Sequence, residues 1–220
     1  MSAPNDAAAE EVARGSTRAA GAAGLLGLAL NVVAVALLAG VPHPYRPDDM
    51  AAWHAGTSGL SAASEASAAC FTFGLLLLVP WARAWGRRGL LGVAGELVAG
   101  GALLNAAGTP LVAVVARFLP VSDPANGPVA RALLGVTLTL DAVFNACLGA
   151  GILLASAGAR SWPRGLRALG VVAGLATLPV ALQYRDARAA DLLAVAGPLW
   201  LAWSTWLALR MLREGATRTD

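Results

Sequence analysis

The sequence predicts an all-α, polytopic membrane protein, built as a bundle of six transmembrane helices. Hydrophobic residues make up 57% of the 220 positions and charged residues 13%, against about 25% charged residues in soluble domains. The charges fall between apolar runs that can cross roughly 30 Å of hydrocarbon at about 1.5 Å per residue. Composition and spacing therefore both indicate a lipid bilayer as the solvent of this chain.

Six apolar runs can be drawn along the chain, at residues 19–41, 58–80, 89–110, 129–157, 165–184 and 191–212. They make residues 19–212 the transmembrane domain, between a flexible N-terminal segment at residues 1–18 and a C-terminal tail at residues 213–220. Residues 1–18 lack the basic start and short apolar core of a cleaved signal peptide. The first span is therefore expected to stay in the mature chain.

Three prolines predict irregularities in the later spans. Pro110 follows "NAAGT" and leaves residues 111–119 either as a bent continuation of the third span or as a short interfacial helix. Pro179 and Pro198 predict bends in the last two spans.

The basic residues predict the orientation of the chain. All 16 are Arg, and they are divided unequally between the two ends of the spans. One face would carry Arg14, Arg18, Arg83, Arg87, Arg88, Arg160, Arg164, Arg167, Arg210, Arg213 and Arg218, and the other Arg46, Arg117, Arg131, Arg185 and Arg188. By the positive-inside rule, both termini are then cytoplasmic. The net charge of +3 follows from this topology and does not indicate a nucleic-acid partner.

The aromatic residues agree with two membrane interfaces. The inner interface would hold Trp81, Trp85 and Trp162, and the outer one Tyr45, Trp53 and Tyr184. Three further tryptophans are spaced by three along the last span and share a broad side of the helix: Trp200, Trp203 and Trp206. They either pack against neighbouring helices or line an aromatic pocket.

The stretch "LTLDAVFNACLG" at residues 138–149 places an acid inside the fourth span. Helical rise puts Asp141 about 18 Å from the outer end of that span, near the midplane. Thr137, Asp141, Asn145 and Gly149 recur every four residues and form one stripe. Such a stripe is expected to face other helices, because an acid at the bilayer centre costs roughly 2.5–3.5 kcal/mol.

Other spans also carry polar residues at several estimated depths. Glu65 and Asn105 are expected in the outer part, Asn31 centrally, and Glu96 with Asn145 in the inner part. Asp141 completes this series as a candidate substrate or ion pathway. No Arg is expected at a comparable depth, so each acid is predicted to be protonated, bound to a cation or exposed to a water-filled cavity.

No metal or cofactor is predicted. The loop "VPHPYRPDDMAAWHAGTSG" at residues 41–59 holds His43, Asp48, Asp49 and His54, but their spacing matches no recognised metal signature. "GTSG" matches the GxSG of rhomboid-type proteases, yet no histidine follows His54 to activate the serine. Cys70 and Cys147 are expected at different depths and without a disulfide.

"SWPRGLRALG" at residues 161–170, followed by "GPLWLAWSTWLALRMLR", resembles a broad group of uncharacterised bacterial six-span membrane proteins in layout. The resemblance implies a multi-pass protein of the bacterial cytoplasmic (inner) membrane. It includes no diagnostic motif and transfers no functional residue.

Three function classes follow from the polar residues. The first is a small carrier or permeation protein for a small molecule or ion, with Asp141 as its central proton or cation site. The second is a membrane-embedded enzyme acting on an apolar isoprenoid or lipid, with Glu65 or Asp141 as proton donor and the tryptophans of the last span around a developing cation. The third is a non-catalytic subunit or scaffold that pairs with a membrane partner or with a second copy.

Overall fold

The computed structural model describes residues 4–38, 50–86, 89–183, 189 and 191–214. The elements in these ranges are helices, with no strand among them: α1 (Pro4–Leu37), α2 (Met50–Gly59), α3 (Ser61–Arg83), α4 (Gly89–Gly108), α5 (Pro110–Phe118), α6 (Asn126–Gly158), α7 (Arg164–Thr177), the 3₁₀ helix η2 (Leu178–Leu182) and α9 (Leu193–Glu214). The predicted all-α class is confirmed for this part of the chain.

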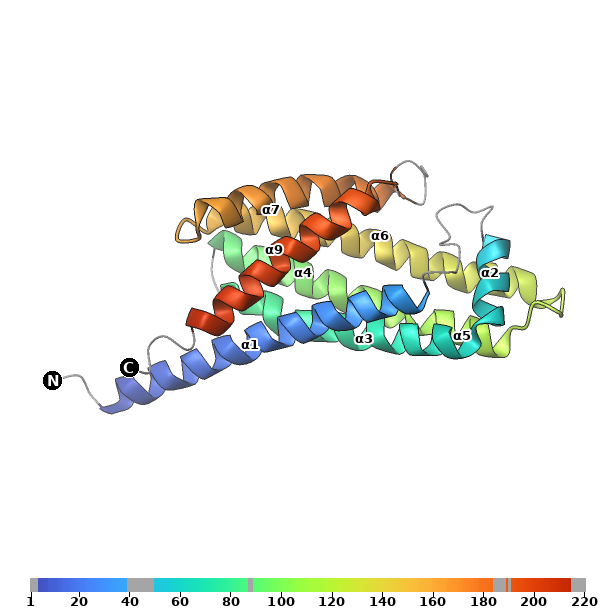
Figure 1. The fold of residues 1–220 in the computed structure, drawn as a ribbon, viewed down its shortest axis with the longest axis horizontal. Coiled ribbons are helices and arrows are strands. Elements are labelled where there is room, and N and C mark those ends of the chain that lie inside the picture. Colours follow the sequence, from blue (N-terminus) through green and yellow to red (C-terminus); the bar gives the residue numbers. More distant parts are fainter. Residues whose placement is uncertain (1–3, 39–49, 87–88, 184–188, 190, 215–220) are drawn as a thin grey trace.

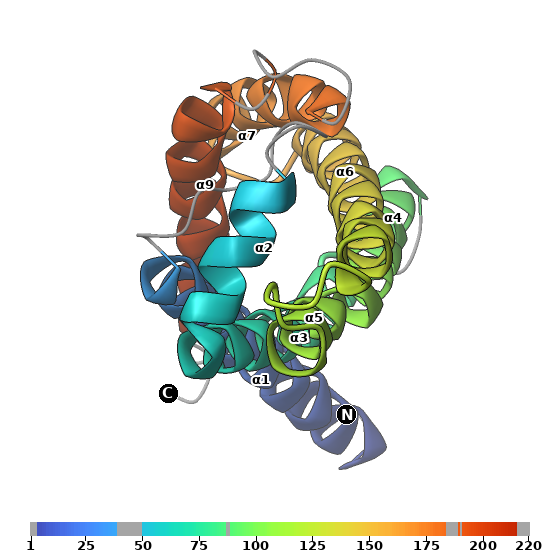
Figure 2. The same cartoon turned by 90° about the vertical axis from the view of Figure 1, so that its right-hand side faces the viewer.

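Six long helices form a closed ring in which each contacts its neighbours, in the order α1, α3, α4, α6, α7, α9 and back to α1 (Figures 1 and 2). The beginning of α1 and the end of α9 lie at the same end of this ring, here called the terminal end (Figure 1). The short helix α2 lies across the opposite end, here called the α2 end (Figure 2). Successive long helices therefore run up and down between the two ends.

Five segments are long and apolar enough to cross a membrane: Gly15–Leu37, Ser61–Arg83, Gly89–Phe118, Asn126–Gly158 and Arg164–Leu182. They correspond to the first five predicted spans and place the chain in the multi-pass membrane class. The sixth predicted span is the helix α9, which completes the ring but is not among these five. Its apolar run is diluted by Pro198, Ser204, Thr205 and three tryptophans.

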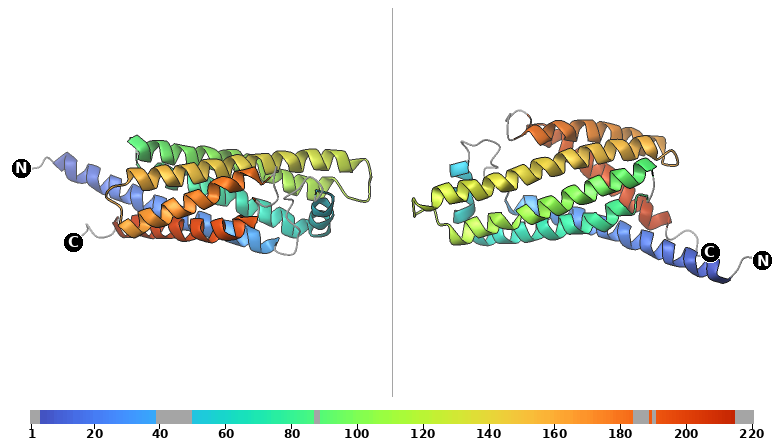
Figure 3. Two further views of the ribbon diagram at one scale, coloured as in Figure 1. Left: turned by 90° about the horizontal axis from the view of Figure 1, so that it is seen from above. Right: turned by 180° about the vertical axis from the view of Figure 1, so that it is seen from behind.

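Several boundaries differ from the predicted ones. Residues 4–18 are helical and continuous with the first span, although the sequence leaves residues 1–18 as a flexible segment. In Figure 3 this part of α1 extends beyond the rest of the bundle. The second span begins at Ser61 because the chain turns at Leu60, where φ is −122° and ψ is 45°. Residues 111–119 mostly continue the third span as α5, since Thr109 keeps helical backbone angles between α4 and α5.

Outward-facing apolar side chains cover the ring on the surface that lipid would contact. Large hydrophobic residues are exposed on successive turns of the long helices, including Leu26, Val33, Phe73, Leu76, Val93, Leu104, Val143, Val172, Leu175 and Leu209. In water such a surface would be unfavourable, because each buried apolar side chain is worth about 1.5–3 kcal/mol. The exposed faces are therefore consistent with a bilayer around the bundle.

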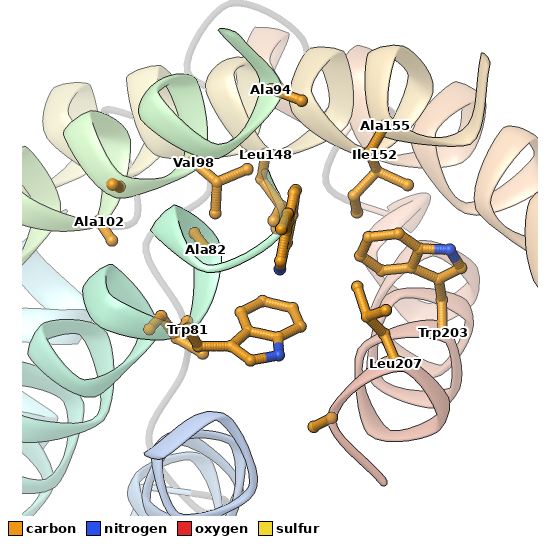
Figure 4. Close-up of a cluster of buried hydrophobic side chains, with 14 of the residues drawn as sticks. Trp81, Ala82, Ala94, Val98, Ala102, Leu148, Ile152, Ala155, Trp203 and Leu207 are labelled. Carbon is orange, nitrogen blue, oxygen red and sulfur yellow. The ribbon is translucent and has the colours of Figure 1, made fainter. Parts of the chain in front are cut away.

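Tryptophans fill the centre of the terminal half. Trp81 and Trp85 of the α3 end region pack edge-on, with ring centroids 4.9 Å apart. Trp203 of α9 lies across the bundle from Trp81, with ring centroids 6.3 Å apart (Figure 4). Its ring also lies 5.3 Å from that of Trp85 and 6.1 Å from that of Trp162. Trp81 and Trp85 are buried. The predicted interfacial role is therefore wrong for both, because their rings turn into the bundle instead of towards lipid headgroups.

Glycines let the helices approach closely around this aromatic cluster. A Cβ at Gly24 would lie 2.5 Å from the Trp81 ring, and one at Gly95 would lie 2.5 Å from the carbonyl oxygen of Ala82. A Cβ at Gly151 would meet Val98 at 2.5 Å. Small residues at these positions let the helix backbones approach closely. In a membrane, where no hydrophobic effect drives helices together, this close packing stabilises their association.

A second hydrophobic core lies at the α2 end. Trp53 of α2 packs there with Val112 and Val115 of α5 and with Ala130, Leu134 and Leu138 of α6. His54 Nε2 lies 2.6 Å from the carbonyl oxygen of Leu119 and ties α2 to the end of α5. With 33 residues, α6 is about 50 Å long and passes well beyond the roughly 30 Å of a bilayer core. The second core buries one side of the first turns of α6, which form this additional length.

The α3–α4 contact gives a matched pair of variants. Gly95→Ala would place its methyl carbon 2.5 Å from a backbone oxygen, whereas nothing lies within 4 Å of a Cβ at Gly100 in the same helix. We expect G95A to destabilise the fold by about 1–3 kcal/mol through overpacking, and G100A to be neutral within about 0.5 kcal/mol. Thermal unfolding in detergent measures both. Equal melting temperatures for the two variants would contradict the close approach of α3 and α4.

Candidate functional site

Three side-chain amides converge on the carboxylate of Asp141. Asn105 Nδ2 of α4 donates to Oδ1 at 3.0 Å, Gln183 Nε2 donates to Oδ2 at 2.7 Å, and Asn145 Nδ2 donates to Oδ2 at 3.0 Å. Asn145 also donates to the carbonyl oxygen of Asp141, one turn earlier in α6. These four residues are here called the Asp141 cluster. The three amides all present N–H donors to Asp141, which suits a carboxylate that accepts hydrogen bonds at both oxygens.

The α6 stripe that the sequence predicts is confirmed. Thr137 Oγ1 donates to the carbonyl oxygen of Gly108 at 3.1 Å, so this side of α6 faces α4. A Cβ at Gly149 would lie 3.1 Å from the carbonyl oxygen of Gly174 in α7 and 3.0 Å from Leu178. Period-four spacing therefore locates the Asp141 side chain between helices and not on the lipid face.

Pro110 explains why α4 carries polar groups at this level. Proline has no N–H to donate to the carbonyl oxygen of Ala106, and Thr109 Oγ1 approaches that oxygen at 3.3 Å instead. The N–H of Val112 donates to the carbonyl oxygen of Thr109 at 3.2 Å. The carbonyl oxygen of Gly108 accepts a hydrogen bond from the Thr137 hydroxyl. Backbone groups freed by proline in a membrane helix need such replacement partners.

Gln183 enters the cluster from the end of η2. Pro179 occupies the first turn of this 3₁₀ helix, and the N–H of Gln183 closes it by donating to Val180 at 2.9 Å. The side chain is 1% exposed. The sequence patterns do not predict this residue, because it stands at the very end of the predicted fifth span, where a polar residue normally faces water. The nearby Pro179 is the available signal that the span ends in an irregular, inward-directed turn.

The cluster lies level with the end of η2. Asp141 is about 26 Å along α6 from its end at Gly158, while α7 and η2 together cover 19 residues, or about 30 Å. Asp141 is thus level with the α2 end of that span, as its bond to Gln183 requires. Asp141 nevertheless lies near the middle of α6, which spans Asn126–Gly158, and its predicted depth near the bilayer midplane stays a prediction.

Glu65 and Glu96 do not join this cluster. Glu65 forms an ion pair with Arg117 at 3.1 Å, and Glu96 forms one with Arg83 at 3.1 Å. All four side chains are 36–64% exposed. The prediction that no Arg neutralises these acids is wrong, because arginines of neighbouring helices reach them across the surface. Exposed pairs of this kind contribute about 0–1 kcal/mol.

Asn31 lies at a separate contact. Its side chain is 6% exposed, and its Oδ1 packs against Gly74 of α3, where a Cβ would be only 2.7 Å away. Of the six predicted pathway residues, the structure therefore unites Asn105, Asp141 and Asn145. It places Asn31 at the α1–α3 contact and the two glutamates on the outer surface.

The three tryptophans of α9 do not form a common pocket. Trp203 is fully buried in the aromatic cluster, whereas Trp206 is 44% exposed. Trp206, Pro163 and Pro198 instead line a shallow apolar groove of about 820 Å³ on the outer face of α9. A spacing of three along a helix spreads side chains over a wide arc, so the middle one points inward and the last one outward.

Among the described residues, the remaining candidate groups add no second site. His43, Asp48 and Asp49 lie outside the described residues, and His54 contacts a backbone carbonyl. Within the described ranges, no group of three or more His, Cys, Asp and Glu side chains could hold a metal ion. Cys70 and Cys147 are free thiols.

Trp203 and Trp206 provide a test of the aromatic arrangement on one helix. We expect Trp203→Ala to destabilise the protein by about 3–5 kcal/mol, because it removes a buried aromatic ring from the centre of the cluster. Trp206→Ala removes an exposed ring and should change stability by less than about 1 kcal/mol. Denaturant unfolding in detergent measures both values. A large loss for W206A with a small one for W203A would reverse this assignment.

The bond between Gln183 and Asp141 can be measured by a double-mutant cycle. We expect Gln183→Leu and Asp141→Leu to be coupled by about 1 kcal/mol in unfolding free energy, within the range of membrane hydrogen bonds. Thr139→Val serves as the control partner, since the Thr139 hydroxyl donates to the carbonyl oxygen of Gly135 in its own helix. Coupling of Gln183 to Thr139 as large as to Asp141 would refute a specific contact.

Comparison with protein-family models, with curated proteins and with solved structures finds no match for this chain. The resemblance to bacterial six-span membrane proteins therefore stays a prediction, and the Asp141 cluster is the observation on which a function can be argued.

Proposed function

We propose that the protein is a small membrane carrier or permeation protein, with Asp141 as the proton or cation site in its polar path. The main support for this proposal is that Asn105, Asn145 and Gln183 all donate hydrogen bonds to this one carboxylate. Three helical elements each contribute an amide or acid, so the site sits where relative movement of those elements would change its shape.

The site is more elaborate than helix pairing alone requires. A single interhelical hydrogen bond contributes about 0.6 kcal/mol on average, against roughly 2.5–3.5 kcal/mol for placing an acid within a span. A serine or an amide at position 141 would join the same helices at lower cost. The presence of an acid supports a role for its charge.

The topology belongs to the same proposal. We take α9 as a sixth crossing, because it closes the ring and brings its end to the side where α1 begins. Most described arginines lie at the terminal end, including Arg83, Arg160, Arg164 and Arg210, whereas Arg117 and Arg131 lie at the α2 end. The positive-inside rule then places the terminal end in the cytoplasm, and the expected setting is a bacterial inner membrane.

The scaffold hypothesis is the second candidate. The Asp141 cluster ties α4, α6 and η2 together, and this bonding alone could specify how the helices pair. It predicts that changes at Asp141 reduce assembly and stability without a separate transport defect. The enzyme hypothesis has less support, because Trp200, Trp203 and Trp206 do not surround one cavity.

Flux through reconstituted protein separates these candidates. Liposomes containing the full chain are assayed for uptake of radioactive sodium and, with an internal pH dye, for proton movement. We expect wild-type protein to carry at least one of these ions, and Asp141→Asn to lower that flux about tenfold or more, because the charge that attracts the ion is removed.

Glu96→Gln is the matched control, since it neutralises another acid that is paired with Arg83 on the surface. Its flux should stay within about twofold of wild type, as expected for an exposed ion pair. Undiminished flux in folded D141N, or no wild-type flux above empty liposomes for either ion, would overturn the proposal.

A further inference from the structure

The Asp141 cluster contains acceptor atoms that no described group uses. Asn105 Oδ1 and Gln183 Oε1 are buried and have no hydrogen-bond partner. Their side chains are only 4% and 1% exposed. A buried carbonyl oxygen without a partner costs about 1–3 kcal/mol. The two oxygens therefore favour a ligand that donates hydrogen bonds or carries positive charge.

The charge beside these oxygens is negative, which also favours a positively charged ligand. Asp141 forms no ion pair with any described Arg, since the ion pairs in these ranges join Glu65, Glu96 and Glu214 to their partners. Asn105, Asn145 and Gln183 are neutral. The described part of the cluster thus combines one carboxylate with amide oxygens, which repels anions and attracts a cation.

We propose that the cluster is a binding site for a small monovalent cation of the sodium type, an inference that rests on the proposed function for the identity of the site. Hard cations take carboxylate and amide oxygens as ligands, whereas zinc and copper prefer sites with His or Cys side chains, which this group lacks. One carboxylate neutralises one monovalent charge. A divalent ion would leave an uncompensated charge in a partly buried place.

The amides can serve both the empty and the occupied site. Turning a terminal amide exchanges its N–H₂ and its oxygen with little change in shape. In the present arrangement the N–H groups hold the carboxylate, and in the occupied one the oxygens of Asn105 and Gln183 face the cation. The elements that carry them, α4 and η2, are thereby coupled to occupancy through Asp141 on α6.

Equilibrium binding tests this inference on the purified full chain in detergent. Thermal unfolding is followed in sodium chloride and in N-methylglucamine chloride at the same ionic strength. We expect saturating sodium to raise the wild-type melting temperature by about 2–4 °C, and to have no effect on Asp141→Asn or Gln183→Leu. Glu96→Gln should keep the wild-type response.

A gain-of-function variant guards against loss through misfolding. Gln183→Glu supplies a second carboxylate, so calcium should stabilise this variant while it leaves the wild type unchanged. A wild-type melting temperature equal in both salts, or a sodium response that persists in folded D141N, would overturn the cation site. Calcium that stabilises wild type and Q183E equally would also overturn it.

The outcomes distinguish this inference from the transport proposal. Sodium binding that depends on Asp141, together with no flux of sodium or protons, would retain the site and reject the carrier. Proton flux that depends on Asp141, together with no sodium response in unfolding, would retain the carrier and reject sodium as its ligand.

Discussion

The carboxylate of Asp141 is the point at which two separate backbone irregularities meet. It sits on a regular part of α6, while its partners come from α4 just before Pro110 and from the turn that ends η2. A charge between apolar helices costs several kcal/mol unless it is hydrogen-bonded. Each element must therefore end or bend where its amide can reach this one side chain, and the α2 half of the bundle is arranged around that requirement.

The two proline sites make this arrangement possible. At Pro110 the lost backbone donor is compensated by the hydroxyl of Thr109, and the freed Gly108 carbonyl accepts Thr137 from α6. The same Thr109 hydroxyl lies 2.7 Å from Thr72 Oγ1 of α3. A polar belt thus runs from α3 through α4 to α6 at the level of Asp141. The belt satisfies the broken backbone and the acid with the same set of short side chains.

Sequence periodicity predicts the elements and the inward stripe of α6, because apolar runs encode helix length and period-four spacing fixes which side chains share a face. Partners across helices are different. Gln183 meets Asp141 only because the ring order and the helix rotations bring the two together. Trp81 likewise turns inward because Gly24 of α1 leaves room for its ring, although a ring near a span end is equally suited to a lipid headgroup. The deciding residues lie on other helices, so no local pattern around either side chain selects its partner.

The two halves of the bundle differ in how easily they could open. The terminal half is closed by aromatic contacts and by glycines at backbone distance, as at Gly95 against Ala82. The α2 half has a hydrophobic core around Trp53 at its outer end. At the level of Asp141 it is held by hydrogen bonds between polar side chains, which can be exchanged for bonds to an ion or water. Yet Trp81, Trp85 and Trp203 also keep buried indole N–H groups without partners. A carrier that releases its ion towards the terminal end would expose these donors to water, and their hydration would offset part of the aromatic packing lost on opening.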